Sequence, residues 1–114
     1  MKLSGFLQRL NDAPGQTEFA DTLAVIDALY EFIPTTFRNG AQVNQAGTNS
    51  GSCKLFAFAG LNRLSPQQTL HCFGRYYRED VLNHPDGTDH QNIRNFMVTG
   101  WAGIVFEGAA LAPK

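Results

Sequence analysis

Cys53 is the residue of this sequence best placed for covalent chemistry. It follows Ser52, which we expect to cap the N-terminus of an apolar helix, and it precedes Lys54. Helix-end N–H groups and a neighbouring cation lower the pKa of a thiol, and the thiolate is the reactive form. With His90 as general base, Cys53 would serve a small hydrolase or transferase. The alternative is that Cys53 is a small buried side chain, because no known catalytic cysteine motif surrounds it.

Residues 41–52 could instead bind a ligand without reacting with it. The segment carries no charge and is rich in Gly, Asn and Ser. Such a composition is typical of a flexible connector, or of an ordered loop whose amide side chains and backbone N–H groups bind something. We expect this loop to face the start of a later helix, and the candidate ligand-binding residues are Asn44, Asn49, Ser52, Asp89, Asn92 and Arg94.

Arg94 and the amide side chains beside it leave two interpretations open. If they line an open cleft next to the 41–52 loop, Arg94 can bind a carboxylate or a phosphate. If they are buried and bonded to one another, they only hold the loop in place. The ligand-binding hypothesis requires Asn49 and His90 to lie on the same side of the molecule.

We predict no metal site, although two histidines and two aspartates lie close together in the sequence. His84, Asp86, Asp89 and His90 are residue types that bind transition metals. Their spacing matches no metal motif, and Asp86 followed by Gly87 is a common turn pair. We therefore expect neither a metal nor another cofactor.

The composition indicates a single soluble domain over residues 1–114. A net charge of -1 and a pI of about 6.2 provide no basic surface for duplex nucleic acid. The longest apolar run, residues 55–59, is too short to span a bilayer, so we expect no membrane partner. Cys53 and Cys72 are too few for a disulfide framework and indicate reduced thiols in a cytosol. The first residues lack the apolar core of a Sec-type signal, which does not exclude a specialised export route.

Five helices are predicted from hydrophobic periodicity and end signals. Ser65, Pro66 and Gln68 form the clearest start signal, because they have the spacing of a capping box with proline at the first helical position. The expected caps of three other helices are Thr17, Ser52 and Thr88. The predicted helices cover residues 4–12, 18–30, 53–61, 66–84 and 89–99.

Two short strands complete the predicted fold, at residues 32–37 and 101–106. Asn39 and Gly40 are a turn signal, but no alternating segment follows within hairpin range, so we predict no hairpin there. The prediction is therefore an α+β fold. About five helices pack around the apolar 53–61 helix, and residues 32–37 and 101–106 form a two-stranded antiparallel sheet.

Long segments of the chain match a known family. Residues 44–59 read NQAGTNSGSCKLFAFA and residues 72–82 read CFGRYYREDVL. These segments and residues 84–106, with shorter stretches at 18–22 and 24–27, resemble the HopJ type III effector family over nearly the whole chain. The family is named after a plant-pathogen protein injected into host cells, and its members also occur in many bacteria without that lifestyle. No enzymatic residue is established for the family, so the resemblance assigns none.

Two hypotheses for function follow. The first is a HopJ-like effector or cytosolic bacterial protein that binds a partner or a small ligand through residues 41–52 and the start of the fifth helix. The partner would be a host or bacterial protein, and the location the bacterial cytoplasm or, through type III secretion, a host cell. The second hypothesis is the hydrolase or transferase that uses Cys53 and His90.

Overall fold

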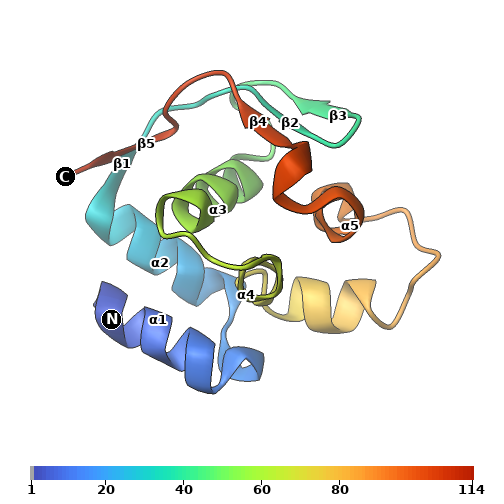
Figure 1. Ribbon diagram of the computed structural model, residues 1–114, viewed down its shortest axis with the longest axis horizontal. Helices are drawn as coiled ribbons and strands as arrows, with labels where there is room; N and C mark the ends of the chain where they lie inside the picture. Colours follow the sequence, from blue (N-terminus) through green and yellow to red (C-terminus); the bar gives the residue numbers. More distant parts are fainter. Residues whose placement is uncertain (1) are drawn as a thin grey trace.

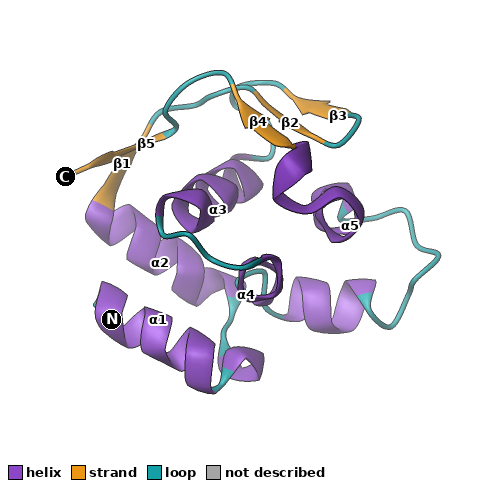
Figure 2. Ribbon diagram, viewed as in Figure 1, coloured by secondary structure: helices purple, strands orange, loops and turns teal. Residues whose placement is uncertain are grey.

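A computed structural model describes residues 2–114 and shows an α+β fold, with the helices on one side of small antiparallel sheets (Figure 1, Figure 2). The α-helices are α1 (Leu3–Asp12), α2 (Phe19–Leu29), α3 (Ser50–Leu61), α4 (Pro66–His71) and α5 (Gln91–Thr99). A π-helical turn covers Tyr76–Val81, and 3-10 turns cover Pro14–Gln16 and Gly100–Gly103. The strands are β1 (Tyr30–Phe32), β2 (Phe37–Asn39), β3 (Gln42–Asn44), β4 (Ile104–Phe106) and β5 (Leu111–Pro113). The predicted α+β class is confirmed.

The strands form two sheets rather than the single predicted pair. β2 pairs with β4, with Phe37 opposite Phe106, and β3 adds to the other edge of β2. β1 pairs with β5, with Phe32 opposite Leu111.

The predicted pairing of residues 32–37 with 101–106 is therefore wrong over most of its length. Phe37 belongs to β2 and residues 104–106 belong to β4, whereas Phe32 ends β1 and pairs in the other sheet. Pro34 has no N–H to donate to a ladder, so the extended chain is interrupted between β1 and β2. Residues 101–103 form part of a 3-10 turn before β4 begins.

A hairpin forms at Asn39 and Gly40, where we predicted none. The chain reverses at Gly40, whose φ is 62°, and β3 pairs with β2 from Gln42 onward. β3 is only three residues long and carries one apolar residue between two amide residues. Its sequence therefore lacks the alternation that identifies a strand.

The aromatic ring of Phe56 on α3 links the helices to the larger sheet. Phe56 is fully buried, as are Leu55 and Phe58 on the same helix. Its ring contacts four others, which come from β2, the segment after α4, α5 and the 3-10 turn: Phe37, Phe73, Phe96 and Trp101. The indole N–H of Trp101 donates to the Leu64 carbonyl at 3.0 Å. Aromatic packing thus joins segments that are far apart in the chain.

The capping box predicted at the start of α4 is confirmed. The Ser65 hydroxyl accepts from the Gln68 N–H at 3.1 Å, and the Gln68 side chain accepts from the Ser65 N–H at 2.9 Å. The other expected caps are wrong. The observed N-caps are Glu18 in place of Thr17, Asn49 in place of Ser52, and His90 in place of Thr88.

Gly74 divides the predicted fourth helix into α4 and the π-helical turn. Its φ is 63°, and a Cβ atom at this position would lie 2.7 Å from the Phe19 nitrogen and 2.9 Å from the Glu18 Cα. The backbone at the start of α2 therefore approaches so closely that only glycine fits.

Within residues 2–114, no helix has both the length and the apolar character needed to cross a membrane.

Candidate functional site

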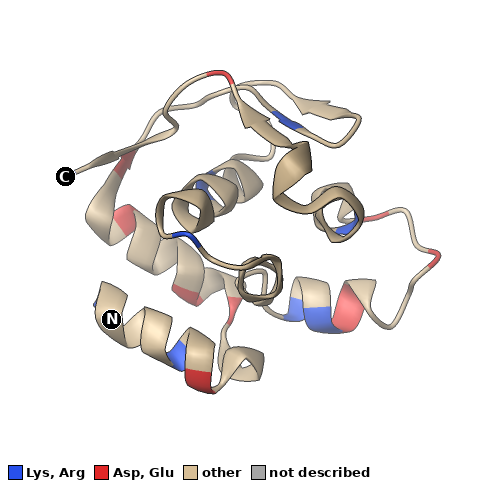
Figure 3. Ribbon diagram, viewed as in Figure 1, with Lys and Arg blue, Asp and Glu red and all other residues tan. Residues whose placement is uncertain are grey.

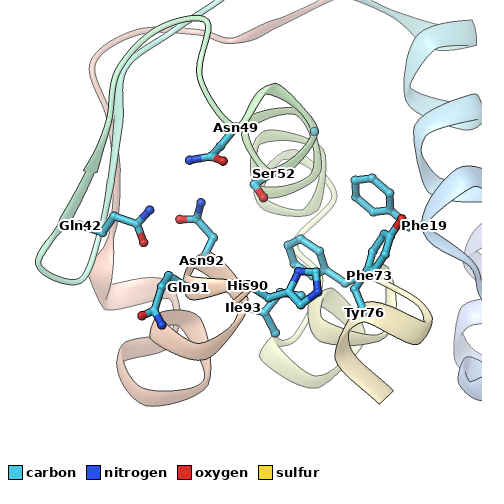
Figure 4. Close-up of a pocket in the computed structure, with 11 residues that line it drawn as sticks. Phe19, Gln42, Asn49, Ser52, Phe73, Tyr76, His90, Gln91, Asn92 and Ile93 are labelled. Atoms are coloured by element: carbon cyan, nitrogen blue, oxygen red, sulfur yellow. The ribbon is translucent and has the colours of Figure 1, made fainter. Parts of the chain in front are cut away.

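A cavity of about 410 Å³ lies where the first turns of α3 and α5 meet the start of α2 and the segment after α4 (Figure 4). Its lining residues are Phe19, Gln42, Asn49, Gly51, Ser52, Phe73, Tyr76, His90, Gln91, Asn92 and Ile93. Figure 4 shows the amide side chains on one side of the cavity and the aromatic rings on the other, with Ser52 and His90 between them. A mixed polar and apolar lining of this size is typical of small-molecule sites.

The aromatic side of the cavity is built from Phe19, Phe73 and Tyr76. The rings of Phe19 and Phe73 are stacked, with centroids 6.0 Å apart. The Tyr76 ring meets Phe19 edge-on at 5.5 Å and is tilted against the His90 ring at 5.2 Å. Gly51 on α3 allows this packing, because a Cβ there would lie 2.8 Å from the Phe19 ring.

The amide side of the cavity rests on a buried hydrogen-bond network around Asn92. The Asn92 Oδ1 accepts from Asn39 at 3.0 Å and from Asn44 at 3.1 Å. The Asn44 Oδ1 accepts in turn from Asn92 at 3.0 Å and from Asn49 at 2.8 Å. The 41–52 segment is not a loop throughout, contrary to the prediction, because residues 42–44 form β3 and residues 50–52 begin α3. Asn39, Asn44 and Asn92 are buried, so these bonds hold the 41–52 segment against α5.

Two lining amides keep hydrogen-bonding capacity beyond this network. Asn49 is exposed and donates one N–H to Asn44, which leaves its Oδ1 and its second N–H available. Gln91 is also exposed and donates one N–H to the Thr88 carbonyl. Buried amides therefore hold the 41–52 segment in place, while exposed amides face the cavity.

Asn49 and His90 share an unusual backbone conformation. They are the N-caps of α3 and α5, both are left-handed with φ of 50° and 51°, and neither side chain caps its helix. Asn49 and His90 lie in the lining with Ser52 and Asn92, so the structure brings these four predicted residues together.

His90 is held by acidic residues beside the cavity. Its Nε2 lies 3.1 Å from the Asp80 carboxylate on the π-helical turn and 3.8 Å from that of Asp89. The Asp80 contact and the Tyr76 ring orient the imidazole from two directions. The Nδ1 atom is not engaged by these contacts.

Arg94 and Asp89 lie outside the lining and bind each other. Arg94 donates to the Asp89 carboxylate at 2.7 Å and to the His84 carbonyl at 2.8 Å. The hydrogen bond from Arg94 holds the pKa of Asp89 below its usual value. Arg94 therefore secures the turn before α5, and the carboxylate that it binds belongs to the protein.

Cys53 also lies outside the lining, inside the helix rather than at its end. Its N–H already donates to the Asn49 carbonyl at 3.0 Å, because α3 begins at Ser50. The thiol is 2% exposed and contacts the Thr35 carbonyl at 3.5 Å. Burial raises the pKa of Cys53, which disfavours the thiolate.

The candidate residues predicted from the sequence include no aromatic residue, so one side of the cavity was missed. A signal was present at Tyr76, which falls outside the apolar stripe of its segment and between the charged residues Arg75 and Arg78. Phe19 carried no comparable signal, since its spacing from Leu23 and Ile26 is that of the buried face of a helix. Among the described residues, no group of three or more His, Cys, Asp or Glu could hold a metal ion.

Comparison with known proteins places the chain in a family. The model of the HopJ type III effector protein family matches residues 3–111. No curated protein matches the chain. The crystal structure of VPA0580, a protein of unknown function, superposes with a TM-score of 0.98 at 57% identity and covers 100% of this chain and 95% of that chain. The chain therefore belongs to the HopJ type III effector family.

Proposed function

We propose that this protein acts by binding a small ligand in the cavity between the 41–52 segment and the start of α5. Family membership suggests an effector-like function. The observation that supports binding is the spare hydrogen-bonding capacity of Asn49 and Gln91 beside an aromatic wall. Ligand sites combine apolar surface with a few polar groups in this way.

An NMR titration with a panel of small polar compounds tests the proposal. A ligand should shift the amide signals of residues 49–52, 76 and 90–93 together. Asn49→Gly should weaken binding, since glycine keeps the left-handed backbone and removes the amide. Arg63→Gly is the matched control, because Arg63 is also left-handed, with φ of 54°, but is not in the lining. Shifts confined to other surfaces, or equal effects of the two variants, would exclude the cavity as the site.

Alkylation kinetics test the alternative of a thiol-dependent hydrolase or transferase. The buried thiol and raised pKa of Cys53 give that alternative no support. We expect iodoacetamide to modify the folded protein slowly at neutral pH and the urea-unfolded protein much faster. Rapid modification of Cys53 in the folded state would favour the enzyme instead.

Export by a type III system and binding to a host or bacterial protein are further proposals that rest on family membership. A reporter fusion should enter host cells from a strain with a working secretion system, and fail to enter from a strain that lacks the secretion ATPase. Equal signals from the two strains would count against export.

A further inference from the structure

We infer that the cavity binds an uncharged flat ring with a donor and an acceptor side by side on its edge, the chemical class of the purine and pyrimidine bases. This inference rests on the function proposed above and names the class of ligand. It is carried by three features of the cavity: its charge, its aromatic side and its amide side.

The lining favours an uncharged ligand. Among the described residues that line the cavity, none is Lys, Arg, Asp or Glu. His90 already faces two carboxylates, Asp80 and Asp89. Figure 3 shows charged residues of both signs spread over the helices and loops. A ligand with a full charge would lose hydration here and meet no Lys, Arg, Asp or Glu side chain of opposite sign in the lining, which is costly.

Tyr76 provides a fixed aromatic surface for the ring. It is 39% exposed, although it lies between Phe19 and His90. These neighbours hold the Tyr76 ring in one orientation, so little side-chain entropy is lost when a ligand packs against it. Aromatic side chains stack against bases in this way, whichever base is bound.

Asn49 provides the polar edge that such a ring requires. Its free N–H and Oδ1 present a donor and an acceptor in one plane, and carboxamides pair with adenine through this arrangement. The bond from Asn49 to the buried Asn44 fixes the orientation of the amide. Gln91 offers a second amide with one bond to Thr88.

The same features favour a free base or nucleoside over a polynucleotide. A bound strand needs cations that follow its phosphates. The arginines nearest in the chain to the lining residues are paired within the protein, Arg75 and Arg78 with Glu18 and Arg94 with Asp89. A saccharide ring is not flat, so its hydroxyl groups present no coplanar donor and acceptor to the Asn49 amide.

The test compares probes that differ in one property, using NMR titration of the whole chain. Uracil and orotate share a ring, but orotate carries an added carboxylate. Uracil or adenine should shift the signals of Asn49, Tyr76 and His90, and orotate should bind at least about tenfold more weakly than uracil. Glucose should produce no shifts at these residues. Tighter binding of orotate, or a preference for glucose, would overturn the inference while leaving a ligand site in the cavity.

Substitutions of Tyr76 and Asn49 test whether these two residues bind the ring. Tyr76→Leu and Asn49→Gly should each weaken uracil or adenine binding about tenfold, and Tyr76→Phe should retain most of it. Arg63→Gly should bind as the wild type does. If Tyr76→Leu does not fold, the uracil-to-orotate ratio of the wild type and the loss in Asn49→Gly still decide the question. If no compound of either panel shifts the cavity residues, the proposed function fails as well.

Discussion

Burial changes the chemistry of individual side chains in this protein, and Cys72 is the clearest case. Its side chain is fully buried, and this burial raises its pKa from 9.0 to about 12. The unfolded chain therefore loses the Cys72 proton at a lower pH than the folded protein does. The stability gained by keeping the thiol neutral is complete below pH 9.0 and is lost as pH rises towards about 12.

Cys72→Ala should reduce the alkaline loss of stability, because it removes the titrating group. We expect the free energy of unfolding of the wild type to fall between pH 9.0 and about 12 by a few kcal/mol more than that of the variant. Urea denaturation under reducing conditions at a series of pH values measures this difference. Val81→Ala also removes buried volume but no titrating group, and it should keep the wild-type pH dependence. Parallel curves for wild type and Cys72→Ala would contradict the prediction.

Helix ends that depend on neighbouring residues could be predicted from the sequence, and those that depend on tertiary contacts could not. The Ser65 capping box depends on residues three apart, and it forms as predicted. The starts of α3 and α5 depend on left-handed residues, Asn49 and His90, which lack the cap signal of Ser52 or Thr88. The break at Gly74 depends on the approach of α2, which no local pattern reveals.

Ser65→Ala should lower the free energy of unfolding by about 1 kcal/mol through the lost cap. Chemical denaturation measures the change. Ser4→Ala is the control, because Ser4 is exposed within α1, and its effect should stay within about 0.5 kcal/mol. An unchanged denaturation midpoint for Ser65→Ala would show that the observed bonds add no stability.

Gly74→Ala should destabilise the protein by about 3 kcal/mol or more. The new Cβ strains a left-handed backbone and also displaces the start of α2. Gly47→Ala separates the two effects, because Gly47 has φ of 89° and no atom within 4 Å of the added Cβ. It should cost only about 1 kcal/mol in the same denaturation experiment. Similar losses in both variants would mean that α2 moves aside without cost.

At the scale of the whole molecule, the cavity depends on amide contacts between distant parts of the chain. Asn92 bonds to Asn39 and to Asn44, which lie 53 and 48 residues away in the sequence. The sequence identified Asn44, Asn49 and Asn92 as candidates, because uncharged loops rich in amides favour such contacts. It could not distinguish the buried amides from the exposed ones, since that depends on how closely the loop packs against α5.

Asn92→Ala should lower the free energy of unfolding by about 3 kcal/mol, since the buried side chains of Asn39 and Asn44 lose their bonds to the Asn92 amide. Hydrogen exchange of residues 41–52 should become faster in this variant. Asn95→Ala is the matched control on the same helix, where partly buried bonds to the Gln42 side chain and the Asn39 carbonyl are lost, at a cost of about 1 kcal/mol. If the exchange of the loop is unchanged in Asn92→Ala, the network does not hold the loop.

The fluorescence of the single tryptophan, Trp101, reports on the packing of the helices. Trp101 lies edge-on to Phe56 and Phe96, at 6.4 and 5.1 Å, and is absent from the cavity lining. Its fluorescence should therefore change when α3 and α5 separate, and stay nearly constant when a small molecule occupies the cavity. One cuvette experiment can then distinguish a compound that enters the cavity from a compound that unfolds the protein.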